Sequence, residues 1–385
     1  MSPRNDTPPA LDGLGYATYR ALGGALPNLV VSPVSIALAV AATWSGARGE
    51  TAQEMASALG LAGSRDASLS LLASFVEGLG AKGAVELAIA NRIFCAARGS
   101  VVPDFLATCE RVFRAGCEDV DFRADPEAAR RHINDFIARA TADRIRELLP
   151  SGAIDDMTSL VLANAVYLNA KWAEPFEKTS TRPGPFQTRG GVIHVPKMTG
   201  TQYTASFSIK PGLRVLELAY LGGKQSLLIL VPDDQDGFEK LERDLSRDCI
   251  AECTVGLEMG EVVVDMPKVD VSAAPSLPLT DALVAAGIER AFDPKRADLT
   301  GIADPPNVDE KLYVAKAFHA ASIRIDEEGT EAAAASAMVV AVLGAPPPST
   351  PPRFDVDRPF LYVLRDNESN AALFLGRVTD PRSAS

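Results

Sequence analysis

The chain has 385 residues, of which 47% are hydrophobic, and its formal net charge at pH 7 is −12. This composition supports a large apolar core and excludes a chain that is disordered throughout, and the acidic balance argues against general binding to nucleic acid or to anionic membranes. The cysteines are odd in number and match no disulfide framework, so we expect reduced, mostly buried thiols at Cys95, Cys109, Cys117, Cys249 and Cys253.

The amino-terminal stretch MSPRNDTPPALDG is polar and lacks the basic start and apolar centre of a secretory signal. The most apolar stretch, residues 29–44, is shorter than the ~20 residues of a membrane-spanning helix, and Pro33 interrupts it. We therefore expect no association with a membrane. The sequence leaves the compartment open, and an extracellular one is favoured.

Helical signals dominate the first part of the chain. From residue 11 to about residue 60 most of them are helical, with Ser32 as a cap and Pro33 in the first turn, where its missing N–H costs nothing. Further helical segments are expected at residues 68–77, 103–114 and 126–149, and one strand at residues 84–94 lies among them.

Strand signals dominate after Leu149. Apolar or β-branched runs bounded by turns predict strands at residues 160–172, 213–220, 226–232, 261–271 and 311–326. A short helix is expected around residues 279–286, and residues 359–378 read as a hairpin around the turn sequence RDNESN. Helices followed by strands indicate an α+β protein and exclude a regularly alternating βαβ one.

The sequence shows no catalytic constellation. GLGAKG, residues 78–83, follows a helical stretch and precedes a strand, which is the reverse of a dinucleotide-binding turn, so we interpret it as a helix end. The three histidines, His132, His194 and His319, are not accompanied by a hydrolase elbow or a zinc motif. We therefore expect a protein that is not an enzyme and that holds no metal or cofactor, with His319 as a hydrogen-bonded structural residue.

Residues 327–354 combine three signals in one segment: an alanine run, a valine-rich run and a proline-rich run. With the period of two of a strand, one face is uncharged throughout, and the only charge between residues 330 and 343, Glu331, lies on the other face. The uncharged face holds Thr330, Ala332, Ala334, Ser336, Met338, Val340 and Val342. This segment is therefore suited to burial as a strand.

Ordered blocks along nearly the whole chain resemble the serpins, a family of serine-protease inhibitors. They include NLVVSPVSIALAVAATWSGARGET (residues 28–51), LANAVYLNAKWAEPF (162–176), KAFHAASIRIDEEGTEAAAASA (316–337) and DRPFLYVLRDNESNAALFLGRVTDP (357–381). The resemblance implies a single domain over residues 12–381 with an α+β serpin fold of three β-sheets and eight or nine helices. It also implies an exposed reactive loop at about residues 328–353, which can insert into the large sheet, sheet A.

The resemblance also implies roles for particular residues. The reactive bond is expected between Leu343 and Gly344, with Val342–Leu343 as the alternative. The hinge that starts insertion is Glu327, Glu328, Gly329, Thr330, Glu331, Ala332, Ala333, Ala334 and Ala335. A buried polar cluster, the shutter, comprises Ser32, Ser35, Asn164 and His319, and the entry region at the top of sheet A, the breach, comprises Trp172, Lys268 and Glu327. Lys268 and Glu327 are expected to pair.

By this resemblance the protein is a suicide-type inhibitor, acting as a monomer on chymotrypsin-, subtilisin- or elastase-like serine proteases. The protease is trapped as a covalent acyl-enzyme when the cleaved loop inserts into sheet A. The uncharged inserting face favours inhibition. The alternative is a non-inhibitory serpin that acts as a carrier, a chaperone or a protease substrate.

Overall fold

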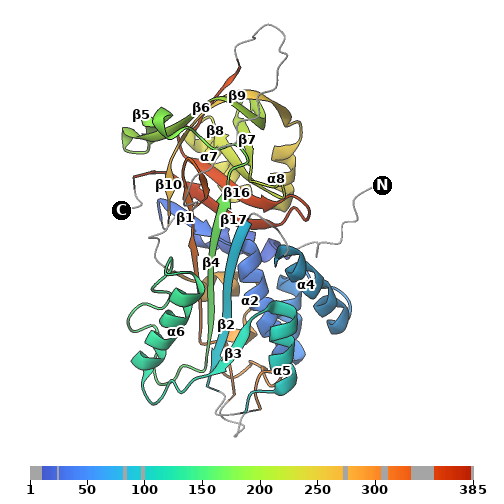
Figure 1. The fold of residues 1–385 in the computed structure, drawn as a ribbon. Helices are drawn as coiled ribbons and strands as arrows, with labels where there is room; N and C mark the ends of the chain where they lie inside the picture. The colour runs from blue at the N-terminus through green and yellow to red at the C-terminus, as the bar shows by residue number, and fades with distance from the viewer. Residues whose placement is uncertain are drawn as a thin grey trace.

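The computed structural model describes residues 11–23, 26–80, 85–96, 100–271, 276–304, 311–330 and 351–382. Within these ranges it contains nine α-helices and seventeen strands, arranged as an elongated α+β molecule (Figure 1). None of the helices in these ranges combines the length and the apolar character needed to cross a bilayer.

Most helices precede the long strands in the chain, as the sequence predicts. They are α1 (Gly13–Leu22), α2 (Pro33–Gly46), α3 (Gly49–Ala58), α4 (Arg65–Gly80), α5 (Pro103–Thr108) with the π-helical turn η1 (Cys109–Phe113), α6 (Pro126–Ala140), α7 (Gln235–Asp244), α8 (Arg247–Thr254) and α9 (Thr280–Ala285). Single 3-10 turns lie at Lys178–Ser180 and Arg290–Phe292. The predicted cap is confirmed, since the Ser35 N–H donates to Ser32 Oγ at 3.2 Å.

The predicted helix over residues 126–149 is wrong in its second half. Helix α6 ends at Ala140, and Ala142 and Asp143 have φ angles of 49° and 61°, which no α-helix accommodates. The Thr141 hydroxyl stabilises the turn by donating to the Ile137 carbonyl and accepting from the Ile145 N–H. Apolar residues after the turn keep a helix-like spacing although the chain is irregular there.

The eight-stranded sheet corresponds to the expected sheet A. It contains β2 (Val85–Cys95), β3 (Gly116–Asp119), β4 (Leu160–Lys171), β10 (Val269–Asp270), β11 (Leu277–Pro278), β12 (Lys316–Ser322), β13 (Arg324–Ile325) and β14 (Gly329–Thr330). The long strands β2 and β4 run side by side through the lower half of the molecule (Figure 1). The single strand predicted over residues 261–271 is interrupted at Lys268, and its last part is β10.

The other sheet has nine strands, so the described residues form two hydrogen-bonded sheets where the resemblance implies three. Its strands are β1 (Asn28–Val31), β5 (Arg182–Thr188), β6 (Gly191–Lys210), β7 (Leu213–Ala219), β8 (Gln225–Pro232), β9 (Glu258–Pro267), β15 (Arg353–Asp355), β16 (Phe360–Asp366) and β17 (Ala372–Val378). Strands β6 and β9 pair antiparallel, and their register shifts between Gly200 and Tyr203. Strands β16 and β17 form the predicted hairpin.

Sheet A separates two cores. Even-numbered β4 residues such as Leu160, Leu162 and Leu168 pack into the main core, which also contains the fully buried helix α2. Odd-numbered residues such as Val161 and Ala163 pack under α6, on the opposite face of the sheet. A further strand in sheet A would follow the same alternation, so one of its faces would pack into the main core and the other would lie on the α6 side.

Candidate functional site

Strand β4 has two different neighbours along one of its edges. Residues 161–167 of β4 pair in parallel with residues 316–322 of β12, and Gly329 and Thr330 of β14 pair antiparallel with Lys171 and Ala170 farther along β4. We call the β4–β12 contact the seam. The seam is closed over seven residue pairs, and directly beyond it the chain that leaves β13 enters the sheet beside β4.

The expected shutter residues are brought together behind the seam. His319 Nε2 accepts from the Ser32 N–H at 3.0 Å, so the ring proton is on Nδ1, which donates to Asn164 Oδ1. Asn164 Nδ2 donates to Ser35 Oγ at 2.6 Å and to the Ser35 carbonyl at 3.0 Å. Because Asn164 and His319 are also register partners across the seam, this cluster connects the two strands to the cap of α2.

Burial keeps the His319 imidazole neutral. The side chain is 0% exposed, and desolvation lowers its pKa from 6.5 to about 3. A neutral ring is required by the hydrogen bonds, because a protonated ring would set an N–H donor against the Ser32 N–H. His319 is thus a structural residue, as expected from the sequence.

Asn91 is a member of this cluster that the sequence reasoning missed. Its Oδ1 accepts from Asn164 Nδ2, and it lies opposite Asn164 in the β2–β4 register. The available signal was an asparagine at one of the alternate strand positions that otherwise hold the apolar residues Leu87, Ile89 and Ile93. A buried amide there needs a partner within the sheet.

At the other end of β4, the expected breach residues surround the chain segment that precedes β14. Trp172 Nε1 donates to the Asp326 carbonyl at 2.9 Å, and the Trp172 N–H donates to the Glu328 carbonyl at 3.0 Å. The Trp172 ring stacks on Tyr220, with centroids 4.6 Å apart and an angle of 11° between the planes.

The expected Lys268–Glu327 ion pair is present, with 2.7 Å between Lys268 Nζ and Glu327 Oε2. The other carboxylate oxygen accepts from Thr181 Oγ1 at 2.6 Å, and the Phe176 N–H donates to the Glu327 carbonyl at 2.8 Å. Burial by itself raises the pKa of Glu327, but the hydrogen bonds from Lys268 and Thr181 outweigh it and the pKa lies below its usual value. Glu327 is therefore an anchored carboxylate at the start of the hinge.

Gly329 and Thr330, two of the expected hinge residues, lie in sheet A as strand β14. Gly329 has a φ of 151°, and a Cβ atom at this position would lie 2.1 Å from the Ala170 carbonyl oxygen, so only glycine fits there. Thr330 is 0% exposed, and its Oγ1 lies 2.7 Å from Tyr220 Oη. The sequence identified Gly329 and Thr330 but gave no signal for Tyr220 or Thr181, which reach this site from other elements.

Helix α6 and the turn after it cover the seam. Their apolar residues share one core with strands β2, β4 and β12; the members from α6 and the following turn include Ile133, Ile137, Ile145, Leu148 and Leu149, and those from β4 and β12 include Val161, Ala163, Phe318 and Ala320. Separating β4 from β12 would therefore displace α6 and the turn after it, or expose their apolar side chains to solvent.

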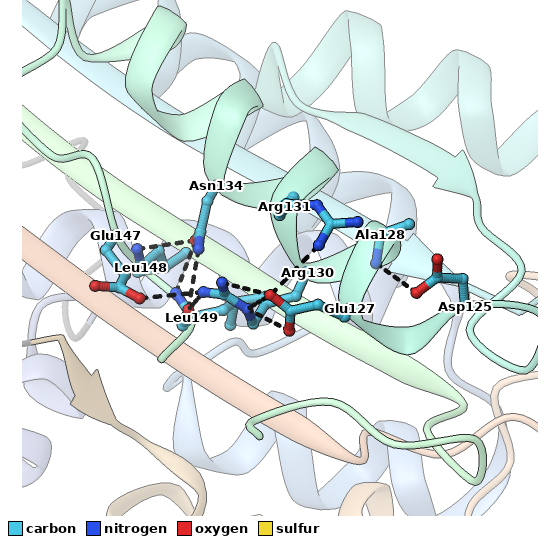
Figure 2. Close-up of polar contacts among 9 residues, drawn as sticks. All are labelled: Asp125, Glu127, Ala128, Arg130, Arg131, Asn134, Glu147, Leu148 and Leu149. Atoms are coloured by element: carbon cyan, nitrogen blue, oxygen red, sulfur yellow. Dashed lines mark hydrogen bonds and ion pairs between the residues drawn. The ribbon is translucent and has the colours of Figure 1, made fainter. Parts of the chain in front are cut away.

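Two side chains of α6 hold the returning chain against the helix (Figure 2). Asn134 Oδ1 accepts from the N–H groups of Leu148 at 3.0 Å and Leu149 at 2.8 Å, and its Nδ2 donates to the Leu149 carbonyl at 3.0 Å. Arg130 donates to the same carbonyl at 2.7 Å and pairs with Glu127 and Glu147. We call these contacts of Asn134 and Arg130 with residues 147–149 the α6 clamp; no sequence pattern indicated it.

The remaining expected site residues lie outside the described part of the chain. These are Glu331, Ala332, Ala333, Ala334 and Ala335 of the hinge and Val342, Leu343 and Gly344 of the reactive bond.

Comparison with known proteins identifies the family. The model of the family described as "Serpin (serine protease inhibitor)" matches residues 10–381. A leukocyte elastase inhibitor of Equus caballus is 35% identical over 374 residues, which cover 94% of this chain and 96% of the relative. Serpin B8 of Homo sapiens is 34% identical over 359 residues, with coverage of 92% and 93%.

The fold agrees with solved serpin structures. The crystal structure of Serpin48 from the insect Tenebrio molitor superposes with a TM-score of 0.85 at 28% identity and covers 99% of both chains. The expected α+β serpin fold is thereby confirmed. The names of these three relatives do not support the extracellular location that the sequence favoured. The chain belongs to the serpin family of serine protease inhibitors.

Proposed function

We propose that this serpin is a suicide-type inhibitor of serine proteases. The protease serine would attack the Leu343 carbonyl, the bond to Gly344 would break, and the cut loop would insert beside β4 before the ester to Leu343 is hydrolysed. The observation that carries the proposal is β14, because Gly329 and Thr330 already stand at the entrance to the seam with a strand register defined on both sides.

That register supports the expected length of the inserted strand. Since Thr330 pairs with Ala170, continued antiparallel pairing would place Ser336 opposite Asn164 and Val340 opposite Leu160, the first residue of β4. The proposed reactive bond lies just beyond that point. A fully inserted loop would thus pair along β4 as far as Leu160 and carry the attached protease to that end of the strand.

The two faces of the inserted loop would also match the two sides of sheet A in their polarity. The uncharged face begins at Thr330 and is in line with the even-numbered β4 residues, which pack into the main core. Burial of Met338 and Val340 there would contribute about 1.5–3 kcal/mol each as an upper estimate. Glu331 would lie on the other face, opposite Asn169, which is partly exposed.

The target class follows from the residue before the cut. Leu343 suits chymotrypsin- or subtilisin-like enzymes, and a cut after Val342 suits elastase-like ones. The name of the relatives, leukocyte elastase inhibitor, supports testing elastase first among the three.

The test is to incubate the protein with elastase, chymotrypsin and subtilisin and to analyse each mixture on a denaturing gel. A covalent band that survives boiling, together with loss of protease activity, is expected. Clean cleavage with undiminished protease activity would refute the inhibitory proposal and favour a non-inhibitory serpin. Mass spectrometry of the released carboxy-terminal peptide distinguishes a start at Gly344 from a start at Leu343.

A further inference from the structure

Two of the five cysteines lie side by side on neighbouring strands of sheet A. Cys95 Sγ and Cys117 Sγ are 3.7 Å apart, at van der Waals contact. Cys95 is the last residue of β2 and is fully buried, and Cys117 is the second residue of β3 and is partly exposed. Both side chains contact the main core, on the face of the sheet away from α6.

Their backbone positions are diagonal. Strands β2 and β3 are parallel, with Cys117 opposite Ile93 and Cys95 opposite Asp119, so the cysteines are offset by two residues along the strands. A disulfide needs about 2.05 Å between the sulfurs and a close approach of the Cβ atoms, so some movement of the backbone is required. Strand β3 has four residues and, within the described chain, pairs with β2 alone, so a shift disturbs one ladder. Its Glu118 is also held by Arg92 and His132, so the bond requires a small shift of β3 against these contacts.

We propose that Cys95 and Cys117 are a redox modification site that forms a reversible intramolecular disulfide by exchange with a small-molecule disulfide. The Cys117 thiolate, the accessible one of the pair, attacks the external disulfide and releases one thiolate of that reagent. The Cys95 thiolate then attacks the Cys117 sulfur and displaces the second. The protein loses two thiol protons and two electrons, and the reagent becomes two thiols.

The diagonal placement makes this bond a labile one. A disulfide that departs from unstrained geometry is more easily reduced, which is typical of regulatory and not of structural disulfides. Once formed, it closes the chain between β2 and β3, a segment that contains α5 and η1, and ties the edge strand to sheet A. The expected consequence is slower hydrogen exchange of the β3 amides in the oxidised protein.

The other neighbouring cysteines, Cys249 and Cys253 on α8, serve as the internal comparison. A hydrogen bond from Cys253 lowers the pKa of the Cys249 thiol, which favours its thiolate, and the side chain is partly exposed. Both lie within the single helix α8 (Arg247–Thr254), whose backbone holds Cβ atoms four residues apart at about 5–6 Å, so bringing them within disulfide range would distort the helix itself, whereas β3 pairs with one strand within the described chain. Mixed disulfides are therefore expected at Cys249, without an internal bond.

The experiment uses the full chain with Cys249→Ser and Cys253→Ser, which leaves three thiols. After exposure to oxidised glutathione and alkylation under denaturing conditions, the number of alkylated thiols should fall from three to one. The unalkylated protein should lose about 2 Da, and peptide mapping should join Cys95 to Cys117. Dithiothreitol should restore all three thiols.

The matched control adds Cys117→Ser, a nearly isosteric change at a partly exposed position. This variant should show no loss of 2 Da and no cross-linked peptide. The proposal is overturned if Cys95 and Cys117 of the parent protein both stay alkylatable, if either is found linked to Cys109, or if a stable glutathione adduct accumulates at Cys117. In the chain that keeps all five cysteines, peptide mapping after the same oxidation should join the same two residues.

Discussion

The hydroxyl groups of Thr330 and Tyr220 are 2.7 Å apart in the interior at the top of sheet A, so Thr330 of the expected hinge is held inside the sheet by a buried hydrogen bond. Tyr220 is stacked on Trp172, which also bonds the chain on either side of Glu327. The side chains of Trp172, Tyr220 and Thr330 therefore line the entrance to the seam.

Thr330→Arg should convert the inhibitor into a substrate. Thr330 is completely buried, and an arginine there would place an unpaired charge in the core, at a cost of several kcal/mol. The fraction of elastase or chymotrypsin trapped should fall more than about tenfold, while cleavage of the loop persists. Thr330→Ser, which keeps the hydroxyl that contacts Tyr220, is the control; trapping by the arginine variant at the parent level would contradict loop insertion.

Lys268→Ala should destabilise the breach. Glu327 is 5% exposed at its side chain and, among the described residues, would keep the hydrogen bond from Thr181 but lose its ion pair, so the free energy of unfolding should fall by about 1–3 kcal/mol. The matched control is Lys178→Ala, since Lys178 pairs with the neighbouring Glu328 but is 68% exposed. Urea unfolding measures both variants, and equal effects would argue against an anchoring role for Lys268.

Acid should weaken the shutter through His319. Its pKa is lowered in the folded chain, so between about pH 6.5 and 3 the unfolded chain binds the proton that the folded chain excludes. Stability should therefore fall with decreasing pH by about 1.4 kcal/mol per unit across that window. His319→Gln should remove this slope, whereas His194→Gln, at an exposed position of β6, should leave it. An unchanged slope in the His319 variant would count against this assignment.

Asn134→Ala should release the chain that the α6 clamp holds. The N–H groups of Leu148 and Leu149 would lose their acceptor in a buried position, at about 1–3 kcal/mol for each unsatisfied group. Hydrogen exchange at these two amides should accelerate strongly. Arg131→Ala is the control, because Arg131 is 58% exposed on the same helix and its ion pair with Glu127 spans 3.7 Å. Protection unchanged in the Asn134 variant would disprove the clamp.

Several elements of this protein were determined by the sequence itself. The start of α2 follows from Ser32 and Pro33, and the β16–β17 hairpin follows from two apolar runs around polar turn residues. These features depend on neighbours in the chain. The same local reasoning predicts the two faces of residues 330–343, of which all but Thr330 lie outside the described residues. The family resemblance, carried by whole blocks of residues, identified the shutter and breach positions that the structure brings together.

Other features depended on contacts between distant segments, and only the tertiary structure decided them. Helix α6 ends at Ala140 although the apolar spacing continues, because Leu148 and Leu149 reach the same core through a turn held by Asn134. Gly329 and Thr330 can pair with β4 because β12 ends its own pairing at Tyr167, and no local sequence pattern indicates where that pairing ends. The same is true of the Asn91–Asn164 and Cys95–Cys117 contacts, because strand register and sheet order place those side chains together.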